Sequence, residues 1–280
     1  MGSGLVLTLA GLLAGVLAGF LGIGGGTVMV PVMVALGLTG VQAVGTSTLA
    51  VALIALVGSV QNWRMGFLKL APVALLGLPA LVTAYLGKEL ATALPDYALL
   101  GSFGLFLLFN IYLIGLKKQV VRRAAQSEGG SAGSDSLPLR VSPTVARLGI
   151  GGLAGFLAGL FGVGGGVVMV PLQILLLHEP IKAAVQTSLG AIVVTGLWAC
   201  LWHAQAGNVL LTTGLILGVA GAIGVQASTR YLPRLPDRAV TIMFRVLLAL
   251  LSVYFFFRAW TSYAALSESV LASEPTLIRR

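Results

Sequence analysis

Two runs of three glycines are the residues whose type and spacing could do chemistry in this sequence. Gly24–Gly26 and Gly164–Gly166 each interrupt an apolar run and precede a short apolar segment starting at Thr27 or Val167. Glycine permits positive φ, and a helix that begins beside it presents unpaired amides and the positive end of its dipole, which suit an anion. Two such ends predict one small-anion site without a buried Lys or Arg. The alternative is that the glycines only permit close packing or a tight bend.

Polar side chains follow each glycine run, near the start of the next apolar segment. They are Thr46, Ser47 and Thr48 in the first half, and Gln186, Thr187 and Ser188 in the second. Their hydroxyl groups could complete the coordination of an oxyanion. Alternatively, Ser and Thr bond the backbone carbonyl of the preceding turn or link helices, which is common in membrane bundles. The residue types alone leave both interpretations open.

Other arrangements that carry chemistry are missing from the sequence. His178 and His203 lie at segment ends without a partner at i+4, and Cys200 is the only cysteine, so we expect interfacial histidines and no metal site or internal disulfide. Neither a Ser–His–Asp arrangement nor an HExxH motif is found. We therefore expect a protein that is not an enzyme and binds no cofactor.

The chain contains two copies of one unit. Ala14–Pro31 reads AGVLAGFLGIGGGTVMVP, and Ala154–Pro171 reads AGFLAGLFGVGGGVVMVP. The match continues with one inserted residue, so that Thr46–Ser47 corresponds to Thr187–Ser188. Glycines four apart, which are typical of close helix packing, also recur in both copies: Gly11, Gly15 and Gly19, then Gly151, Gly155 and Gly159. The two halves therefore share one fold.

Composition predicts a membrane protein. Hydrophobic residues make up 58% of the 280 positions and charged residues 9%, with a mean hydropathy of +1.02. Several uncharged runs approach the ~20 residues that cross a bilayer, and they lack the alternation of barrel strands. The net charge of +9 does not indicate a nucleic-acid partner, because the cations sit mostly at segment ends and in one linker. We therefore expect an all-α integral membrane protein.

Each half divides into a Gly-rich segment, a short segment and three longer ones. The first half has segments near 4–21, 27–37, 43–60, 70–87 and 97–116, and the second near 145–161, 167–177, 184–202, 209–229 and 239–259. The short segments would cover only ~16 Å as helices, too little to cross the membrane core. Each half is therefore expected to contain a broken or re-entrant Gly-rich pair of helices.

Basic residues predict how the halves are oriented. Residues 117–143 form a polar, Gly- and Ser-rich linker with several Lys and Arg residues, which favours the cytoplasm. If each half crosses an odd number of times, Lys182 and Arg230 are cytoplasmic as well, whereas parallel halves would put them outside. We therefore expect two inverted repeats at 1–116 and 144–260, a C-terminal tail at 261–280, and both termini outside.

The acidic residues limit the kind of substrate. By these boundaries, all of them lie in loops, the linker or the tail, so no carboxylate remains in the membrane interior to relay protons or bind a cation. Inverted repeats with interrupted helices are a recurring architecture of secondary transporters, which hold the substrate near the bilayer midplane. Transport of an anion is therefore the leading hypothesis.

The motif GxGGGxxxxP at Gly22–Pro31 and Gly162–Pro171, followed in each half by Thr-Ser, resembles the TauE/SafE sulfite exporter family. The resemblance implies a multi-helix transporter of sulfite, related sulfur anions or organosulfonates in a bacterial inner membrane. It points to these binding residues: Gly24, Gly25, Gly26, Thr46 and Ser47, then Gly164, Gly165, Gly166, Thr187 and Ser188. Gly45 precedes the first Thr-Ser but Gln186 the second, so the site is expected to be asymmetric, with Gln186 adding an amide donor.

These observations lead to one leading function and two alternatives. We expect a secondary transporter or facilitator that binds a small anion, sulfite or an organosulfonate, between two Gly-rich helix ends. The alternatives are a channel-like anion facilitator and a membrane scaffold or assembly factor that transports nothing. The expected partners are the small anion and membrane lipid, with no nucleic acid; association into a homo-oligomer stays open.

Overall fold

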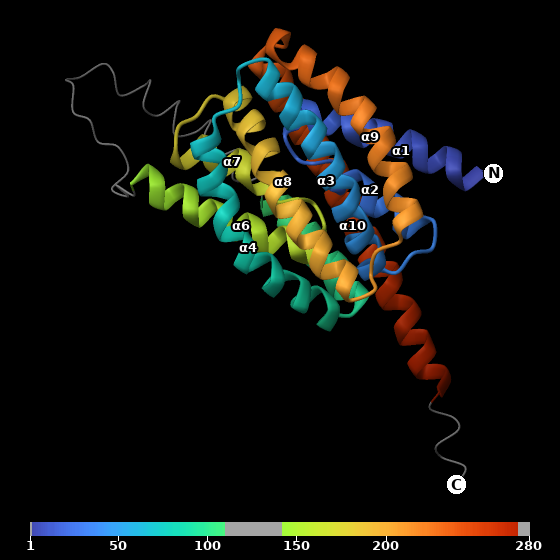
Figure 1. Ribbon diagram of the computed structural model, residues 1–280. Helices are drawn as coiled ribbons and strands as arrows, with labels where there is room; N and C mark the ends of the chain where they lie inside the picture. Colours follow the sequence, from blue (N-terminus) through green and yellow to red (C-terminus); the bar gives the residue numbers. More distant parts are fainter. Residues whose placement is uncertain (1, 110–141, 274–280) are drawn as a thin grey trace, which may run out of the picture.

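A computed structural model of the protein describes residues 2–109 and 142–273, and these residues form helices and short connections without strands. The first half contains α1 (Gly2–Leu21), α2 (Gly26–Ala35), α3 (Gly40–Arg64), α4 (Leu70–Ala93) and a helix over Asp96–Phe109. The second half contains α6 (Pro143–Phe161), α7 (Gly166–Leu176), α8 (Ile181–Gln205), α9 (Leu211–Tyr231), a 3₁₀ turn over Leu232–Arg234 and α10 (Asp237–Ser273). The predicted all-α fold is confirmed (Figure 1).

Each predicted segment corresponds to one helix, but two helices run further than expected. α4 continues to Ala93, because helix-forming residues persist until the stop before Pro95, and this places Lys88 and Glu89 inside the helix. α10 continues to Ser273, past the predicted end of the last segment, since no Gly or Pro interrupts it. Most of the predicted linker 117–143 and the last residues of the chain lie outside the described residues.

The exterior of the bundle suits a lipid environment. Seven of the described helices are long and apolar enough to cross a membrane. Their outward faces expose large apolar side chains, such as Val82 at 70% and Val253 at 72%. Apolar surface of this extent is found where a protein meets lipid or another protein. The chain is therefore a multi-pass membrane protein.

The two repeats are interleaved, because the first helix of each packs along the fourth helix of the other. The close approach comes from the repeated glycines. A Cβ atom on Gly11 or Gly15 would meet the backbone of Leu217 or Gly221 in α9. In the other repeat, Cβ atoms on glycines of α6 would meet the backbone of α4: Gly151 at Leu76, Gly155 at Ala80, and Gly159 at Ala84. The predicted packing role of these glycines is confirmed.

The same contacts define helix directions. Along α1 and α9, the contacted residue numbers rise together, so these helices are parallel, and the same holds for α6 with α4. Between α3 and α8, the residue numbers rise in opposite directions, because Gly58 lies by Leu189 while Gly196 lies by Ala52. Corresponding helices of the two repeats, α3 and α8, are therefore antiparallel at the centre of the bundle.

The long helices form two groups, each with members from both repeats. α1, α3 and α9 are parallel and pack on one another, and α4, α6 and α8 form the equivalent group in the opposite direction. The groups meet mainly along α3 and α8 (Figure 1). Because α2 packs on α3 and α7 on α8, one short helix belongs to each group.

Basic residues gather at the end of the bundle where α3 ends and α8 begins. Seven of the described Lys and Arg residues lie there: Arg64, Lys69, Arg147, Lys182, Arg230, Arg234 and Arg238. Two of them tie connections together: the Arg147 guanidinium bonds the Glu179 carboxylate at 2.9 Å, and the Lys182 ammonium donates to the Pro233 carbonyl at 3.0 Å. The opposite end has Lys88 paired with Glu89 at 2.8 Å.

Candidate functional site

The two glycine runs meet in the middle of the protein and are fully buried there. The N-cap residues of α2 and α7 are Gly25, with φ of 83°, and Gly165, with φ of 79°. Only glycine adopts this left-handed conformation without strain. From this point, α2 runs toward the end where α3 begins, and α7 toward the end where α8 begins. The two short helices therefore start at the centre and diverge.

The glycine stretches cross each other too closely for side chains. A Cβ atom on Gly26 would meet the carbonyl oxygen of Gly162, and one on Gly166 would meet that of Gly22. The two contacts are equivalent by the repeat. The stretch between α1 and α2 thus lies directly against the stretch between α6 and α7, and both need glycine for close approach as well as for positive φ.

A pair of apolar side chains fills the space beside both stretches. Val51 of α3 and Ile192 of α8 occupy equivalent positions in the repeats, and both are fully buried. A Cβ atom on Gly24 would lie 3.0 Å from Val51 and 3.3 Å from Ile192, and one on Gly164 would lie 2.7 Å and 2.8 Å from them. The Val51–Ile192 pair therefore sits between the two short-helix ends, in close contact with both glycine stretches.

Each short helix presents donors toward this centre. In α2, the amides of Val28 and Met29 already donate to the Gly25 carbonyl, whereas the first amides, those of Gly26 and Thr27, find no acceptor among the described residues. α7 repeats the pattern, with Val168 and Met169 donating to Gly165. With the helix dipoles, these buried amides give the centre a positive potential that no Lys or Arg supplies.

Two predicted polar residues of the first repeat bond to different parts of the second. Ser47 lies at the glycine crossing, where its hydroxyl is 2.9 Å from the Gly162 carbonyl and 2.7 Å from that of Val44. Thr46, the residue before Ser47 in α3, accepts the amide hydrogen of Leu210 with its hydroxyl at 3.0 Å, at the connection between α8 and α9. These two hydroxyls therefore hold backbone groups of the other repeat.

In the second repeat, the predicted residues are arranged differently. Ser188 accepts a hydrogen bond from the amide of Gln173 at 2.9 Å, whereas Gln186 and Thr187 are almost fully buried and make no hydrogen bond within the described chain. The contacts of the two halves differ at Gln173, whereas the expected role of Gln186 as an amide donor stays a prediction. Met33 occupies the position of Gln173 in the first repeat.

Three buried polar residues near the site were not singled out in the sequence. The Thr195 hydroxyl donates to the Gly164 carbonyl at 2.9 Å, and Gln173 holds Ser188. The third is Thr27, whose fully buried hydroxyl has no partner. Thr27 directly follows a glycine run, so its position could have signalled a role. Thr195 and Gln173 lie in apolar runs without such a signal.

The histidine prediction is wrong for His203. This side chain is fully buried, and its Nε2 atom lies 2.8 Å from the Gly159 carbonyl near the end of α6. The reason is tertiary, since α6 packs over the last turn of α8 and carbonyls at a helix end need a donor. His178, in the connection from α7 to α8, is exposed as expected.

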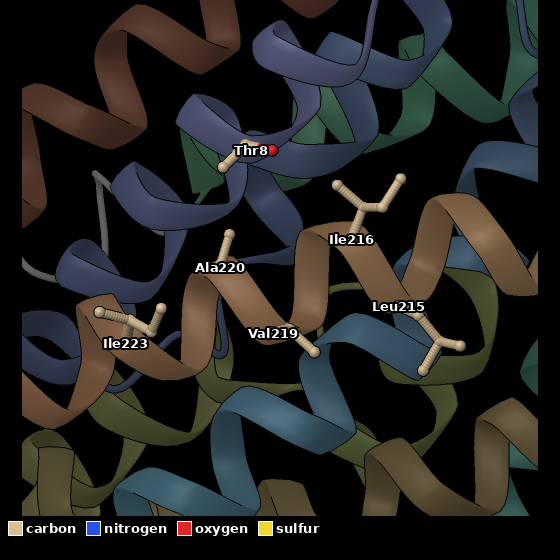
Figure 2. Close-up of a pocket in the computed structure, with 6 residues that line it drawn as sticks. All are labelled: Thr8, Leu215, Ile216, Val219, Ala220 and Ile223. Atoms are coloured by element: carbon tan, nitrogen blue, oxygen red, sulfur yellow. The ribbon is translucent and has the colours of Figure 1, made fainter.

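A surface hollow lies away from this centre. It measures about 410 Å³ and is lined by Thr8 of α1 and by Leu215, Ile216, Val219, Ala220 and Ile223 of α9 (Figure 2). The Thr8 hydroxyl, its only polar side-chain group, already donates to the Gly4 carbonyl at 2.9 Å. A hollow of this composition on the outer face suits a lipid chain rather than an anion.

The sequence is similar to that of a known protein family along most of its length. Residues 7–255 match the profile of the family described as "Sulfite exporter TauE/SafE". The chain belongs to this family. The match includes both glycine runs and ends within α10, so both halves of the TauE/SafE chain are covered.

Curated relatives carry general names. A "probable membrane transporter protein" of Bacillus subtilis is 26% identical over 269 residues, covering 88% of this chain and 94% of that protein. One of Methanocaldococcus jannaschii is 26% identical over 250 residues, covering 82% and 88%. One of Haemophilus influenzae is 38% identical over 101 residues, covering 33% and 37%. No solved structure matches. The TauE/SafE chain is thus a member of a membrane transporter family.

Proposed function

We propose that this protein is a secondary transporter of a small oxyanion, sulfite or an organosulfonate, bound where α2 and α7 begin. The observation that carries the proposal is the meeting of two buried helix N-termini, one from each repeat, at the Val51–Ile192 pair. Buried amides aimed at one point stabilise negative charge without a charged side chain. The family description supports sulfur oxyanions as the class of substrate.

The proposed binding residues are those expected from the sequence: Gly24, Gly25, Gly26, Thr46, Ser47, Gly164, Gly165, Gly166, Gln186, Thr187 and Ser188. The glycines would supply amides and close approach. Ser47 would act by holding the second glycine stretch, since its hydroxyl already lies against the Gly162 carbonyl. Gln186 and Thr187, which have no hydrogen-bond partner within the described chain, would be free to turn toward the anion.

We also propose that the repeats are inverted in the membrane, with residues 117–143 on the cytoplasmic side of a bacterial inner membrane. The antiparallel course of α3 and α8 supports the inverted arrangement. The seven basic residues at one end of the bundle support the orientation, because short connections rich in Lys and Arg stay in the cytoplasm.

Alternating access would use the two helix groups rather than the two repeats. Close glycine packing ties α1 to α9 and α6 to α4, so rocking of one sequence repeat against the other would break these contacts. Movement of the α1–α3–α9 group against the α4–α6–α8 group keeps them and changes mainly the seam between α3 and α8 and the glycine crossing. Such motion would expose the centre to one side at a time.

Sulfite uptake into proteoliposomes containing the full chain tests this proposal. We expect saturable uptake, acceleration by sulfite on the opposite side, and competition by thiosulfate or organosulfonates. Counterflow acceleration distinguishes a carrier from a channel. Absence of flux for every sulfur anion would contradict the proposal and favour a scaffold role.

A pair of glycine variants tests the site. Gly25→Ala should abolish uptake, because its Cβ would lie 3.0 Å from the Ala14 carbonyl oxygen at the α2 end. Gly37→Ala is the matched control: Gly37 also has positive φ, but nothing lies within 4 Å of its Cβ position. Equal uptake by both variants, at equal amounts of folded protein, would place the site elsewhere.

A further inference from the structure

Thr27 of α2 directly follows the first glycine run, and its buried hydroxyl has no hydrogen-bond partner in the described structure. Thr27 is fully buried in the first turn of this helix, directly after Gly26. Helical side chains tilt toward the N-terminus of their helix. The hydroxyl therefore lies at the N-terminal end of α2, at the same end as the free amides of Gly26 and Thr27.

Three other buried hydroxyls close to the two glycine runs are engaged with the backbone. Ser47 bonds the Val44 and Gly162 carbonyls, Thr195 bonds the Gly164 carbonyl, and Thr48 bonds the Gly45 carbonyl at 2.6 Å. A buried hydroxyl without a partner is costly, and native proteins rarely leave one unless a ligand or water completes it. Thr27 thus differs from its neighbours in having a donor to spare.

The second repeat does not repeat this feature. Val167 follows Gly166 at the equivalent position of α7 and is fully buried as well. Both helix ends offer backbone amides, but only the α2 end offers a hydroxyl. The centre is therefore chemically asymmetric despite the repeated glycines.

We propose that Thr27 is a specificity-determining residue, whose hydroxyl donates a hydrogen bond to one oxygen of the transported anion held at the N-terminus of α2. This inference rests on the proposed function. Donation from a hydroxyl and two amides within one turn suits an anion with several separate oxygens, such as sulfite or a sulfonate. A halide, with a single spherical centre, gains less from donors that point to different places.

Binding to Thr27→Val tests this role, because valine keeps the shape of threonine and removes the donor. We expect the Kd for sulfite, measured by calorimetry on the full chain in detergent, to rise about tenfold, with the KM for uptake rising in parallel. Competition by chloride should change less than about twofold. Thr27→Ser, which keeps the donor, should restore sulfite affinity.

The matched control is Thr229→Val. Thr229 is also fully buried, but it lies on α9 and its hydroxyl donates to the Val225 carbonyl of its own helix at 2.7 Å. It should bind sulfite as the unchanged protein does. If Thr27→Val binds sulfite within about twofold of the unchanged protein, the hydroxyl does not contact the anion and the inference is overturned.

Thermal unfolding without any anion separates this inference from the proposed function. A hydroxyl reserved for a ligand has no partner to lose, so Thr27→Val should unfold at the same or a higher temperature, whereas a structural hydroxyl would give a lower one. Sulfite, sulfate, methanesulfonate and phosphate are then added in turn. If only a sulfur-free oxyanion stabilises the protein and Thr27→Val loses that effect, the Thr27 role stands while the sulfur substrate fails. If no anion stabilises the unchanged protein, both fail.

Discussion

Ser47 illustrates how single hydroxyl groups connect the two repeats at the residue scale. It lies on α3 of the first repeat, and its hydroxyl reaches the Gly162 carbonyl just before α7 of the second. Thr195 of α8 holds the next carbonyl but one, that of Gly164. Carbonyls in a non-helical stretch within a membrane protein need such partners, since water and lipid provide none there. These hydroxyls therefore keep the second glycine stretch unwound.

Ser47→Ala should destabilise the protein by about 1–3 kcal/mol, because it leaves the buried Gly162 carbonyl without this donor. The measurement is thermal or denaturant unfolding in detergent. Thr92→Ala is the control: its hydroxyl bonds carbonyls of its own helix at an exposed position. A loss of stability for Thr92→Ala as large as that for Ser47→Ala would argue against a special role for the glycine stretch.

At the scale of elements, the paired helices are held together by close packing at small residues rather than by polar contacts between side chains. α6 presents glycines to α4 along one face, whereas Gly149 near its start has no neighbour within 4 Å of its Cβ position. In lipid, apolar side chains gain little from leaving the solvent, so close backbone contact provides much of the association.

Gly151→Ala and Gly149→Ala should therefore have opposite effects. Both lie inside α6, but a Cβ on Gly151 would meet the Leu76 backbone, whereas nothing lies within 4 Å of one on Gly149. We expect Gly151→Ala to lose about 1–3 kcal/mol from overpacking. Gly149→Ala should gain up to ~1 kcal/mol from helix propensity. Unfolding midpoints measured side by side decide this, and equal shifts would contradict the assigned packing.

α2 is also held from outside by α10. The Tyr254 hydroxyl donates to the Pro31 carbonyl and the Arg258 guanidinium to the Val34 carbonyl, both at 2.9 Å. The cation also lies at the negative end of the α2 dipole. These contacts fix the helix whose opposite end forms half of the proposed site.

Arg258→Gln should lower stability by about 1–2 kcal/mol and weaken anion uptake, because α2 loses a charge-assisted contact. Uptake and unfolding are measured on the same preparation. Arg238→Gln, at the exposed start of the same helix, is the control and should change neither. Unchanged uptake in Arg258→Gln would mean that α2 needs no support from α10.

The whole molecule consists of two interleaved groups of helices that meet along α3 and α8. A Cβ on Gly196 would lie 3.5 Å from the Ala52 Cβ, a separation that a disulfide can bridge. Within one group, a Cβ on Gly152 of α6 would lie 3.7 Å from the Pro79 Cβ of α4, also within the disulfide range. These two positions allow one cross-link between the groups and one inside a group.

Oxidising an Ala52→Cys, Gly196→Cys variant should reduce sulfite uptake about tenfold or more if the groups must move apart, and reduction should restore it. The variant is made with Cys200→Ser, which removes the native thiol. The control cross-link, Gly152→Cys with Pro79→Cys, should leave uptake largely intact. Full uptake with the first cross-link closed would exclude motion along this seam.

The sequence by itself determined the membrane class, the repeat, the helix segments and the two glycine runs. These features depend on local composition and on identity between the halves, which require no knowledge of the fold. The end of α4 was missed because helix-forming residues continue to Ala93 beyond the apolar run. The inversion and the binding residues stay predictions.

Only the tertiary structure decided which surfaces meet. In a soluble protein, the polar face of a helix marks its exposed side and so reveals which side is buried, but apolar membrane helices lack such a face. No sequence pattern could therefore show that α1 lies on α9 or that Val51 meets Ile192 beside both glycine stretches. For the same reason, the sequence could not distinguish Ser47, whose hydroxyl holds Gly162, from Thr27, whose hydroxyl has no partner. The role of a hydroxyl depends on the groups within about 3 Å of it. Ser47 and Thr195 reach the carbonyls of Gly162 and Gly164, which lie in other segments of the chain, and only the folded structure brings them together.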